Sequence, residues 1–442
     1  MEYRAANLDY PLPWSTRRAP ATPTPAAQSR TVTEPSRLVA LAILVQVGAS
    51  SVVMVEPALC DILFPPVFIL TLITGHMLSP LRMPRLLLAS IGLFILANYA
   101  SILGARGWGY TGSVIYMAVT IYLLLYVVFL AGFLGKFGES GMRVVRDGYQ
   151  IAAIIAAVIG ILASLRLLPN SEMFFRDASM VRVQSTFKDP NVFAPFLVGA
   201  VLLSLPPLLQ SRRLELRHLV VIGLSLAGIT LASSRGAYVH LVVSLVVFFG
   251  IQFAIIQERR TNRRLVGRVM LALPLLVLGI AYLLMTTDLG AYGLERLSLQ
   301  SYDEQRFSNQ LASLAVAHEN VWGIGPGQYT GPRFIQDVHN TYLKVLVENG
   351  IVGLFAYLAM VATSLFYGLA GVLRRGRFAV LQAAFVAVIV GIMVENLVID
   401  TLHWRHLFLF LGLPVGLTLY ERTTDRSRAA ERSVLPSPAG AS

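Results

Sequence analysis

The side chains best suited to chemistry in this chain are basic ones that lie between long apolar segments. Arg235 is the clearest, because Ser233-Ser234-Arg235-Gly236 separates two apolar runs and places a glycine beside the guanidinium. A guanidinium donates to two phosphate oxygens at once, so several of them would suit a pyrophosphate or a polyanionic glycan. Other candidate cations are Arg182, Lys188, Arg306, Arg333 and Arg405. The alternative is that these side chains extend to lipid headgroups or pair with local acids.

His339 is the candidate general base. It precedes a predicted helix and stands beside Asn340 and Thr341. A histidine with a pKa near ~6.5 can take a proton from a hydroxyl group at neutral pH. A lone histidine is more often structural, and the other six have contexts typical of that role: His76, His218, His240, His318, His403 and His406.

The residue spacing does not favour a metal or a bound cofactor. Asp303 and Glu304 are adjacent and would point apart on a helix, and Asp337 and His339 alone do not make a ligand set. The glycine turn Gly323–Gly327 lacks the Gly-Lys-Ser/Thr ending of a phosphate loop, and no Gly-X-Ser-X-Gly elbow occurs. The sequence therefore predicts chemistry without a metal or cofactor, and the glycine turn is interpreted as a plain turn.

The elements that must position these residues are apolar helices. Hydrophobic residues make up 55% of the chain and charged residues 14%, whereas soluble domains carry about 25% charged residues. The apolar runs are continuous and near the length of ~20 residues that spans a bilayer, which argues against a barrel. We predict an all-α polytopic integral membrane protein with about twelve transmembrane helices. The predicted spans are Leu38–Val55, Pro57–Leu78, Arg85–Gly104, Gly112–Leu134, Gln150–Leu168, Asn191–Leu209, Leu219–Ala232, Ala237–Ile256, Leu265–Met285, Gly350–Leu373, Ala379–Ile399 and Trp404–Leu419. Within the second span we expect Pro65-Pro66 to break the helix.

The distribution of charge predicts the orientation. The net charge is +12 with a pI near 10.0, but the cations form short clusters between apolar runs, which is typical of cytoplasmic membrane loops and not of a nucleic-acid-binding surface. We expect residues 1–37 to be a disordered cytoplasmic tail, residues 38–420 to be the transmembrane domain, and residues 421–442 to be a second cytoplasmic tail. Cys60 is the only cysteine, so no intrachain disulfide can form.

This orientation leaves two long segments on the outer side, Pro169–Pro190 and a loop from about residue 286 to 349. Within the second segment, apolar spacing predicts a helix over Asp303–Val321. A second short helix is expected over Thr341–Asn349, with Gly350 as its left-handed cap. All the candidate cations and His339 would then lie on the same side of the membrane.

Three stretches carry a resemblance to a known family. They are Ser185 to Ala194, with its Phe-Lys-Asp-Pro-Asn segment, Ser233-Ser234-Arg235-Gly236, and the stretch from Arg306 through His339-Asn340-Thr341-Tyr342-Leu343 to Glu348-Asn349-Gly350-Ile351-Val352-Gly353. In their order and spacing, from about Arg182 to Trp404, the chain resembles the O-antigen ligase and O-antigen polymerase superfamily of bacterial envelope glycosyltransferases.

The resemblance implies a metal-independent, inverting glycosyltransferase of the GT-C type. It further implies a glycan donor on undecaprenyl pyrophosphate, an acceptor sugar hydroxyl on a glycan or on lipid A-core, and an active site at the periplasmic face of the bacterial inner membrane. By position, Arg182, Arg235 and Arg306 would hold the pyrophosphate and His339 would serve the acceptor. We expect His339 and Arg235 to be catalytic, and further substrate-binding residues to be Arg182, Lys188, Arg306, Arg333 and Asn340.

Several alternatives stay open at this stage. The motifs do not separate a polymerase from a ligase, or either from a branch that glycosylates protein hydroxyls. A polytopic transporter or a flippase for lipid-linked glycans has a similar number of spans. Transporters, however, usually show repeated halves and ionisable residues at mid-membrane, and these features are not evident in the sequence.

Overall fold

The regular structure is helical, as the sequence predicts. The computed structural model describes residues 34–103, 109–176, 181–211, 215–254, 301–329 and 337–434. Within these residues, the only β-structure is one isolated antiparallel bridge between Phe175 and Val183. The helices are α1 (Arg37–Gly48), α2 (Leu59–Ile73), α3 (Arg85–Ile102), α4 (Gly109–Ser164), α5 (Pro190–Gln210), α6 (Leu216–Ala232), α7 (Arg235–Ala254), α10 (Ser301–Glu319), α11 (Thr341–Leu373), α12 (Ala379–Glu395) and α13 (Arg405–Val434). Short 3-10 helices lie at Ala49–Ser51, Pro80–Arg82 and Ser171–Phe174.

The apolar helices indicate a multi-pass membrane protein. In the described part of the chain, α3, α4, α5, α7 and α11 are long and apolar enough to cross a membrane, and α1, α2, α6 and α12 are shorter apolar helices. Large apolar side chains such as Leu96, Val246 and Phe366 are exposed, as expected for surfaces that face lipid. The full set of twelve spans is not confirmed, and Leu265–Met285 lies outside the described residues.

One predicted break is confirmed and one is wrong. Helix α4 consists of two helices that meet at Gly138, where φ is 52° and ψ is −115°, and this break lies between the predicted spans Gly112–Leu134 and Gln150–Leu168. The helices extend through the charged segment up to this glycine, because glutamate, lysine and arginine are good helix formers. The predicted break at Pro65-Pro66 is wrong: α2 runs through both prolines, because neighbouring helices can support a helix that loses proline hydrogen bonds.

The helices of the outer loop are close to the prediction. Helix α10 begins at Ser301 and ends at Glu319, and α11 begins at Thr341 as expected. Gly350 interrupts α11 with a φ of 71°, which confirms the predicted positive φ, but the chain continues directly into the following span. At the C-terminus, α13 continues through Val434, so the predicted tail from 421 is helical over most of its length.

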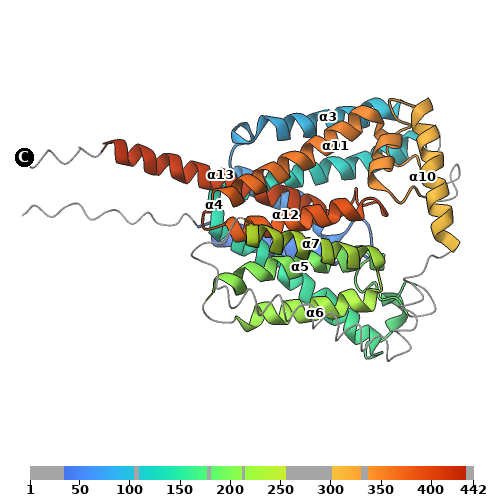
Figure 1. Cartoon of the computed structure of the whole chain (residues 1–442), viewed down its shortest axis with the longest axis horizontal. Helices are drawn as coiled ribbons and strands as arrows, with labels where there is room; N and C mark the ends of the chain where they lie inside the picture. The colour runs from blue at the N-terminus through green and yellow to red at the C-terminus, as the bar shows by residue number, and fades with distance from the viewer. Residues whose placement is uncertain are drawn as a thin grey trace, which may run out of the picture. The chain divides into compact units, whose positions relative to one another are not determined.

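Two helices form the centre of the packing. Helix α5 is buried over most of its length, and α12 contacts α5, α7, α11 and α13. Helix α4 packs against α1, α6 and α13. Figure 1 shows the long helices running roughly in one direction, with α10 lying across their right-hand ends.

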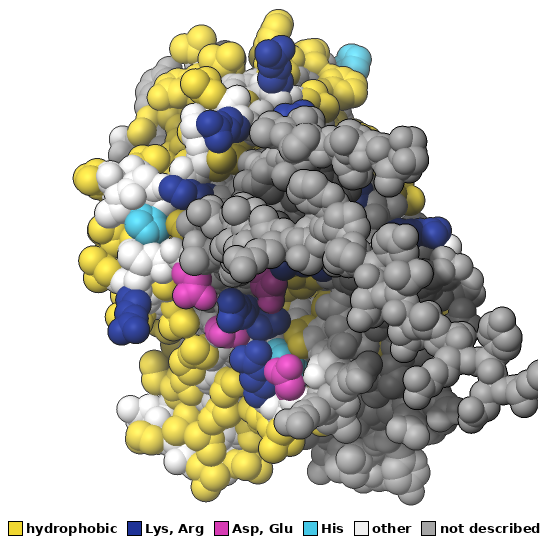
Figure 2. Space-filling view, turned by 90° about the vertical axis from the view of Figure 1, so that its left-hand side faces the viewer, with side chains coloured by type: hydrophobic (Ala, Val, Ile, Leu, Met, Phe, Trp, Pro, Cys, Tyr) yellow, Lys and Arg dark blue, Asp and Glu magenta, His cyan; other side chains and the backbone are white. Residues whose placement is uncertain are grey.

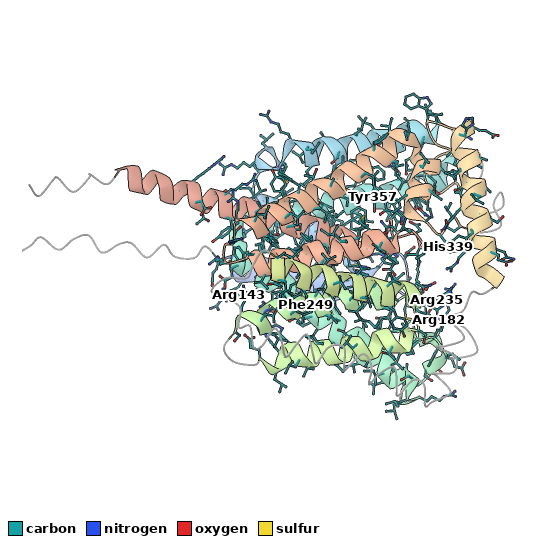
Figure 3. All side chains as sticks on the ribbon, viewed as in Figure 1. Arg143, Arg182, Arg235, Phe249, His339 and Tyr357 are labelled. Atoms are coloured by element: carbon teal, nitrogen blue, oxygen red, sulfur yellow. The ribbon has the colours of Figure 1, made fainter. Side chains whose placement is uncertain are left out.

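The opposite end of the helices carries paired charges. Basic and acidic side chains gather there beside apolar ones (Figure 2). The ion pairs that join these segments are Arg143–Glu34 (3.9 Å), Arg217–Asp147 (3.4 Å), Arg374–Asp425 (3.3 Å) and Arg377–Glu139 (3.1 Å). Arg143 lies at this end, whereas Arg182, Arg235 and His339 lie at the other (Figure 3). Cations from several segments between apolar runs thus lie at the end away from the predicted site.

Candidate active site

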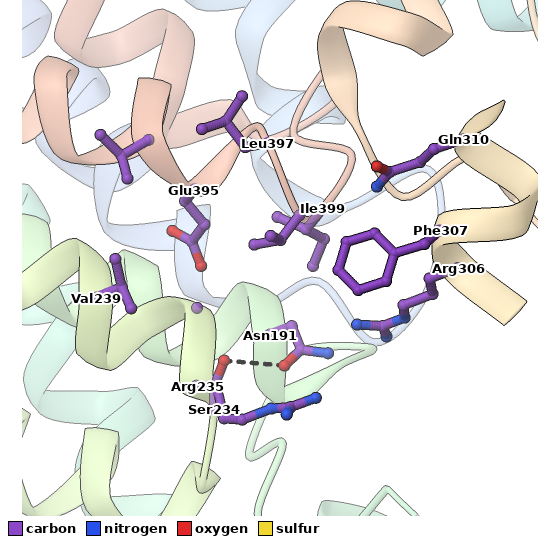
Figure 4. Close-up of a pocket in the computed structure, with 13 residues that line it drawn as sticks. Asn191, Ser234, Arg235, Val239, Arg306, Phe307, Gln310, Glu395, Leu397 and Ile399 are labelled. Carbon is purple, nitrogen blue, oxygen red and sulfur yellow. Dashed lines mark hydrogen bonds between the residues drawn. The ribbon is translucent and has the colours of Figure 1, made fainter. Parts of the chain in front are cut away.

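A cavity of about 390 Å³ brings together two of the predicted cations. Arg235, at the start of α7, and Arg306, on α10, both line it although they are far apart in sequence. Phe307 and Gln310 of α10 form the outer wall, as Figure 4 shows. Because two guanidinium groups share one cavity, the site is suited to an anionic ligand.

The turn between α6 and α7 fixes the position of Arg235. Ser233 ends α6 in the left-handed conformation, with a φ of 47°, and the Ser234 hydroxyl accepts from the backbone N–H of Ala237 at 3.4 Å. The same hydroxyl donates to Oδ1 of Asn191 at 2.9 Å. The turn is therefore tied to α5, and Arg235 follows it directly into the cavity wall.

Arg182 supports this wall from behind and is not part of the lining. Its Nη2 donates to Asn191 Oδ1 at 2.9 Å, and its Nε donates to the carbonyl of Ala232 at 3.3 Å. Asn191 lines the cavity, and its backbone N–H donates to Asp189 at the start of α5. Arg182 is buried and joins the first outer segment to the ends of α5 and α6, so the structure gives it a positioning role.

The inner wall is aliphatic except for one carboxyl group. Val239 of α7 and Leu397 and Val398 after α12 line this side together with Glu395. The Oε2 of Glu395 lies 3.0 Å from Nδ1 of His240, and both side chains are fully buried. An ionisable residue within an apolar span is by itself a signal of function, and Glu395 is the only charged residue of the predicted span Ala379–Ile399.

His339 lies beside the cavity, between α10 and the start of α11. Its φ is 46°, and its carbonyl accepts from Nε2 of Gln310 at 3.4 Å. Burial lowers the pKa of His339 below its usual value of 6.5, and the nearby Arg306 cation lowers it further against the opposing effect of Asp337. The imidazole is therefore neutral at neutral pH, as a general base must be.

A buried ion cluster anchors the segment that carries His339. Lys344, in the first turn of α11, lies 3.1 Å from Asp337 and 2.8 Å from Asp400. Thr341 adds backbone contacts to the loop after α12, because its N–H donates to the carbonyl of Asn396 at 2.9 Å. The segment before α11 and the loop after α12, which borders the cavity, are thus held as one piece.

Asn340 also joins the segment before α11 to the loop after α12. Its Oδ1 accepts from the backbone N–H of Leu343 at 3.0 Å and caps α11, and its Nδ2 donates to the carbonyl of Leu397 at 3.0 Å. These contacts hold the backbone on either side of the cavity. Asn340 does not line the cavity itself.

The glycine turn is more than a connector. The Glu348 carboxylate accepts from the backbone N–H groups of Gly327 at 3.0 Å and Tyr329 at 3.2 Å. A Cβ at Gly323 would lie 2.4 Å from the Glu348 carbonyl oxygen, and one at Gly350 would lie 2.4 Å from the Val321 carbonyl oxygen. The turn therefore packs directly onto the kink in α11, with backbone touching backbone.

The structure does not bring the remaining candidates into the cavity. Lys188 forms an ion pair with Glu56 at 2.7 Å, and Arg405 donates to Asp61 from Nε at 2.8 Å and Nη2 at 2.5 Å. Arg333 lies outside the described residues. Within the residues the structure describes, no group of three or more His, Cys, Asp or Glu side chains is placed to hold a metal ion, and the predicted metal independence stays a prediction.

Fold and site together define a multi-pass helical membrane protein with a basic cavity at one end of its helices. The family model described as O-antigen ligase matches residues 219–358, which confirms the predicted relationship to the O-antigen ligase and polymerase superfamily. The matched stretch contains Arg235, Arg306 and His339, and it indicates a function in glycan transfer in O-antigen biosynthesis. No curated protein matches the chain.

Proposed function

We propose that the protein is an inverting glycosyltransferase that moves a glycan from undecaprenyl pyrophosphate onto an acceptor sugar hydroxyl. The acceptor is the sugar of another glycan or of lipid A-core. The observation that carries this proposal is the convergence of Arg235 and Arg306 in one cavity with an aliphatic inner wall. A pyrophosphate joined to a lipid chain has the same combination of a dianionic head and an apolar body.

In the proposed reaction, the acceptor oxygen forms a bond to the anomeric carbon as the bond from that carbon to the pyrophosphate oxygen breaks. Attack opposite the leaving group inverts the configuration. The acceptor proton passes to the neutral imidazole of His339. The charge that grows on the leaving pyrophosphate is stabilised by Arg235 and Arg306, and fixed guanidinium groups do this best where water is scarce. Arg182 keeps its role in positioning the cavity wall through Asn191.

We further propose that the cavity faces the periplasm of a bacterial inner membrane and that both termini are cytoplasmic. The support is the separation of charges along the helices. Arg143 lies at the end opposite Arg235 and His339 (Figure 3), and loops rich in lysine and arginine remain in the cytoplasm.

The test is the pool of lipid-linked glycan in cells that carry Arg235→Gln. Loss of one guanidinium should slow transfer about 100-fold or more, because it removes a donor that stabilises developing charge. We expect the amount of surface glycan to fall and undecaprenyl-linked glycan to accumulate. The accumulated glycan is then separated by chain length. Single repeat units would identify a polymerase, and long chains would identify a ligase.

The matched control is Arg143→Gln at the opposite end of the helices. Arg143 is exposed and its ion pair with Glu34 is 3.9 Å long, so this change should leave the pool as in wild type. A normal pool and normal surface glycan in the Arg235→Gln cells would overturn the proposal. Accumulation confined to the cytoplasmic leaflet would point instead to a flippase.

A further inference from the structure

The wall of the cavity contains a buried acidic group that the proposed reaction does not use. Glu395 is the last residue of α12, and its carboxyl group lies against α7. Within the described part of the chain, Oε1 of Glu395 and Nε2 of His240 are buried atoms without a hydrogen-bond partner. Such atoms are uncommon in folded proteins, and each one needs an explanation.

Glu395 Oε1 lies in the cavity wall, packed against Gly236. The other oxygen, Oε2, lies 3.0 Å from Nδ1 of His240, which fixes the carboxyl plane. A Cβ at Gly236 would lie 2.8 Å from Oε1, so the oxygen has room only because this residue is a glycine. Glu395 and Gly236 both line the cavity, and Figure 4 shows Glu395 between Val239 and Leu397.

A purely structural role does not explain this arrangement. Burying a carboxyl group in an apolar wall is costly unless both oxygens are satisfied, and an aliphatic residue would pack there without that cost. The pair does connect α7 to α12, but Ser244 already makes such a connection by donating to the carbonyl of Ala387 at 3.0 Å. The unsatisfied oxygen is explained if a molecule in the cavity donates to it.

We propose that Glu395, oriented by His240, binds a hydroxyl group of the donor sugar. The inference rests on the proposed function, because it assigns the donor sugar to the half of the cavity that the pyrophosphate does not occupy. The cations of Arg235 and Arg306 attract the pyrophosphate, while the carboxyl group of Glu395 disfavours a second anion and accepts from a hydroxyl. The sugar directly attached to the pyrophosphate is thereby oriented before the acceptor arrives. His240 is a positioning residue in this arrangement.

The test compares two ligands on the purified full-length chain in detergent. The probes are bare undecaprenyl pyrophosphate and the undecaprenyl-pyrophosphate-linked glycan extracted from cells that lack the protein. Wild type should bind the glycan-linked form about tenfold or more tightly than the bare form, as expected for one hydrogen bond to a charged group. Glu395→Gln and Glu395→Leu should lose this preference and bind the bare lipid at least as well as wild type.

The controls separate recognition from folding. Ser244→Ala removes the other polar link between α7 and α12 and does not touch the cavity, so it should keep the full preference. His240→Asn should reduce the preference without weakening the bare lipid. If Glu395→Leu fails to fold, the isosteric Glu395→Gln gives the result.

The outcomes distinguish this inference from the proposed function. Equal binding of both lipids by wild type, or an unchanged preference in the folded Glu395 variants, would overturn the role of Glu395. Failure of wild type to bind bare undecaprenyl pyrophosphate would instead overturn the assignment of the arginines.

Discussion

Removing Lys344 should release the segment that holds His339. The ammonium group of Lys344 lies between Asp337 at 3.1 Å and Asp400 at 2.8 Å, and its side chain is 4% exposed. The Lys344→Met change keeps most of the volume and the apolar stem, and it leaves two carboxylates without their cation. The expected consequence is a loss of stability together with a loss of transfer activity.

The magnitude follows from the two distances and the burial. At an effective dielectric constant of about 20, each contact corresponds to roughly 5–6 kcal/mol of attraction, most of which is offset by desolvation of the ions. Removing one partner of a buried pair costs about 3–5 kcal/mol. Because Asp337 is 28% exposed and can be partly hydrated, we expect the lower end of that range, about 3 kcal/mol.

The assay is the free energy of unfolding in mixed micelles titrated with sodium dodecyl sulfate. Lys344→Met should lower it by about 3 kcal/mol, and adding Asp400→Asn should restore part of the loss because one uncompensated charge is removed. The control is Arg374→Met, which breaks an exposed pair with Asp425 and should cost less than about 1 kcal/mol. A Lys344→Met protein within about 0.5 kcal/mol of wild type would refute the reasoning.

Two further predictions concern the same end of the molecule. In the pH profile of the transfer rate, the midpoint on the acid side should lie below pH 6.5, because the pKa of His339 is lowered and protonation of the base stops the reaction. Arg306→Gln should move this midpoint toward neutral pH, since the Arg306 cation helps to lower the pKa of His339. Gly323→Ala should reduce the yield of folded protein in size-exclusion chromatography, because its Cβ would lie 2.4 Å from a carbonyl oxygen at a φ of 91°.

Each of these predictions has a matched comparison. For the first, a midpoint that shifts to lower pH in Arg306→Gln would contradict the electrostatic account. For the second, Gly92→Ala in α3 places its Cβ in open space, so this change should leave the yield unchanged. Equal yields from the Gly323 and Gly92 variants would show that the turn can shift away from α11.

The sequence predicts the helical class and much of the outer loop, because apolar periodicity and single glycines act locally. Gly350 is an example, since the need for a positive φ can be read from one residue and the structure has it there. The position of the break at Gly138 and the passage of α2 through Pro65 could not be predicted in this way. At Gly138 the ring of Tyr420, remote in sequence, fills the space that a side chain would need.

For the cavity, too, the residue types could be predicted from the sequence, but contacts between remote residues could not. Arg235 and Arg306 were predictable from their residue type and their position between apolar runs, and both line the cavity. The partners of two other candidates are distant in sequence: Lys188 forms an ion pair with Glu56, and Arg405 donates to Asp61. Glu395 is not among the candidates predicted from the sequence, because its neighbours in the sequence are apolar, although an acid inside a span is itself a signal.

The walls of the cavity differ in how freely they can change during evolution. The inner wall belongs to helices that pack on several neighbours, and a side chain at Gly236 would place its Cβ 2.8 Å from Glu395. The outer wall belongs to α10, where Phe307 is 55% exposed and Gln310 is half-buried. Substitutions at exposed positions usually change the free energy of unfolding by no more than about 0.5 kcal/mol. The shape of the outer wall can therefore change at a lower cost in stability than that of the inner wall.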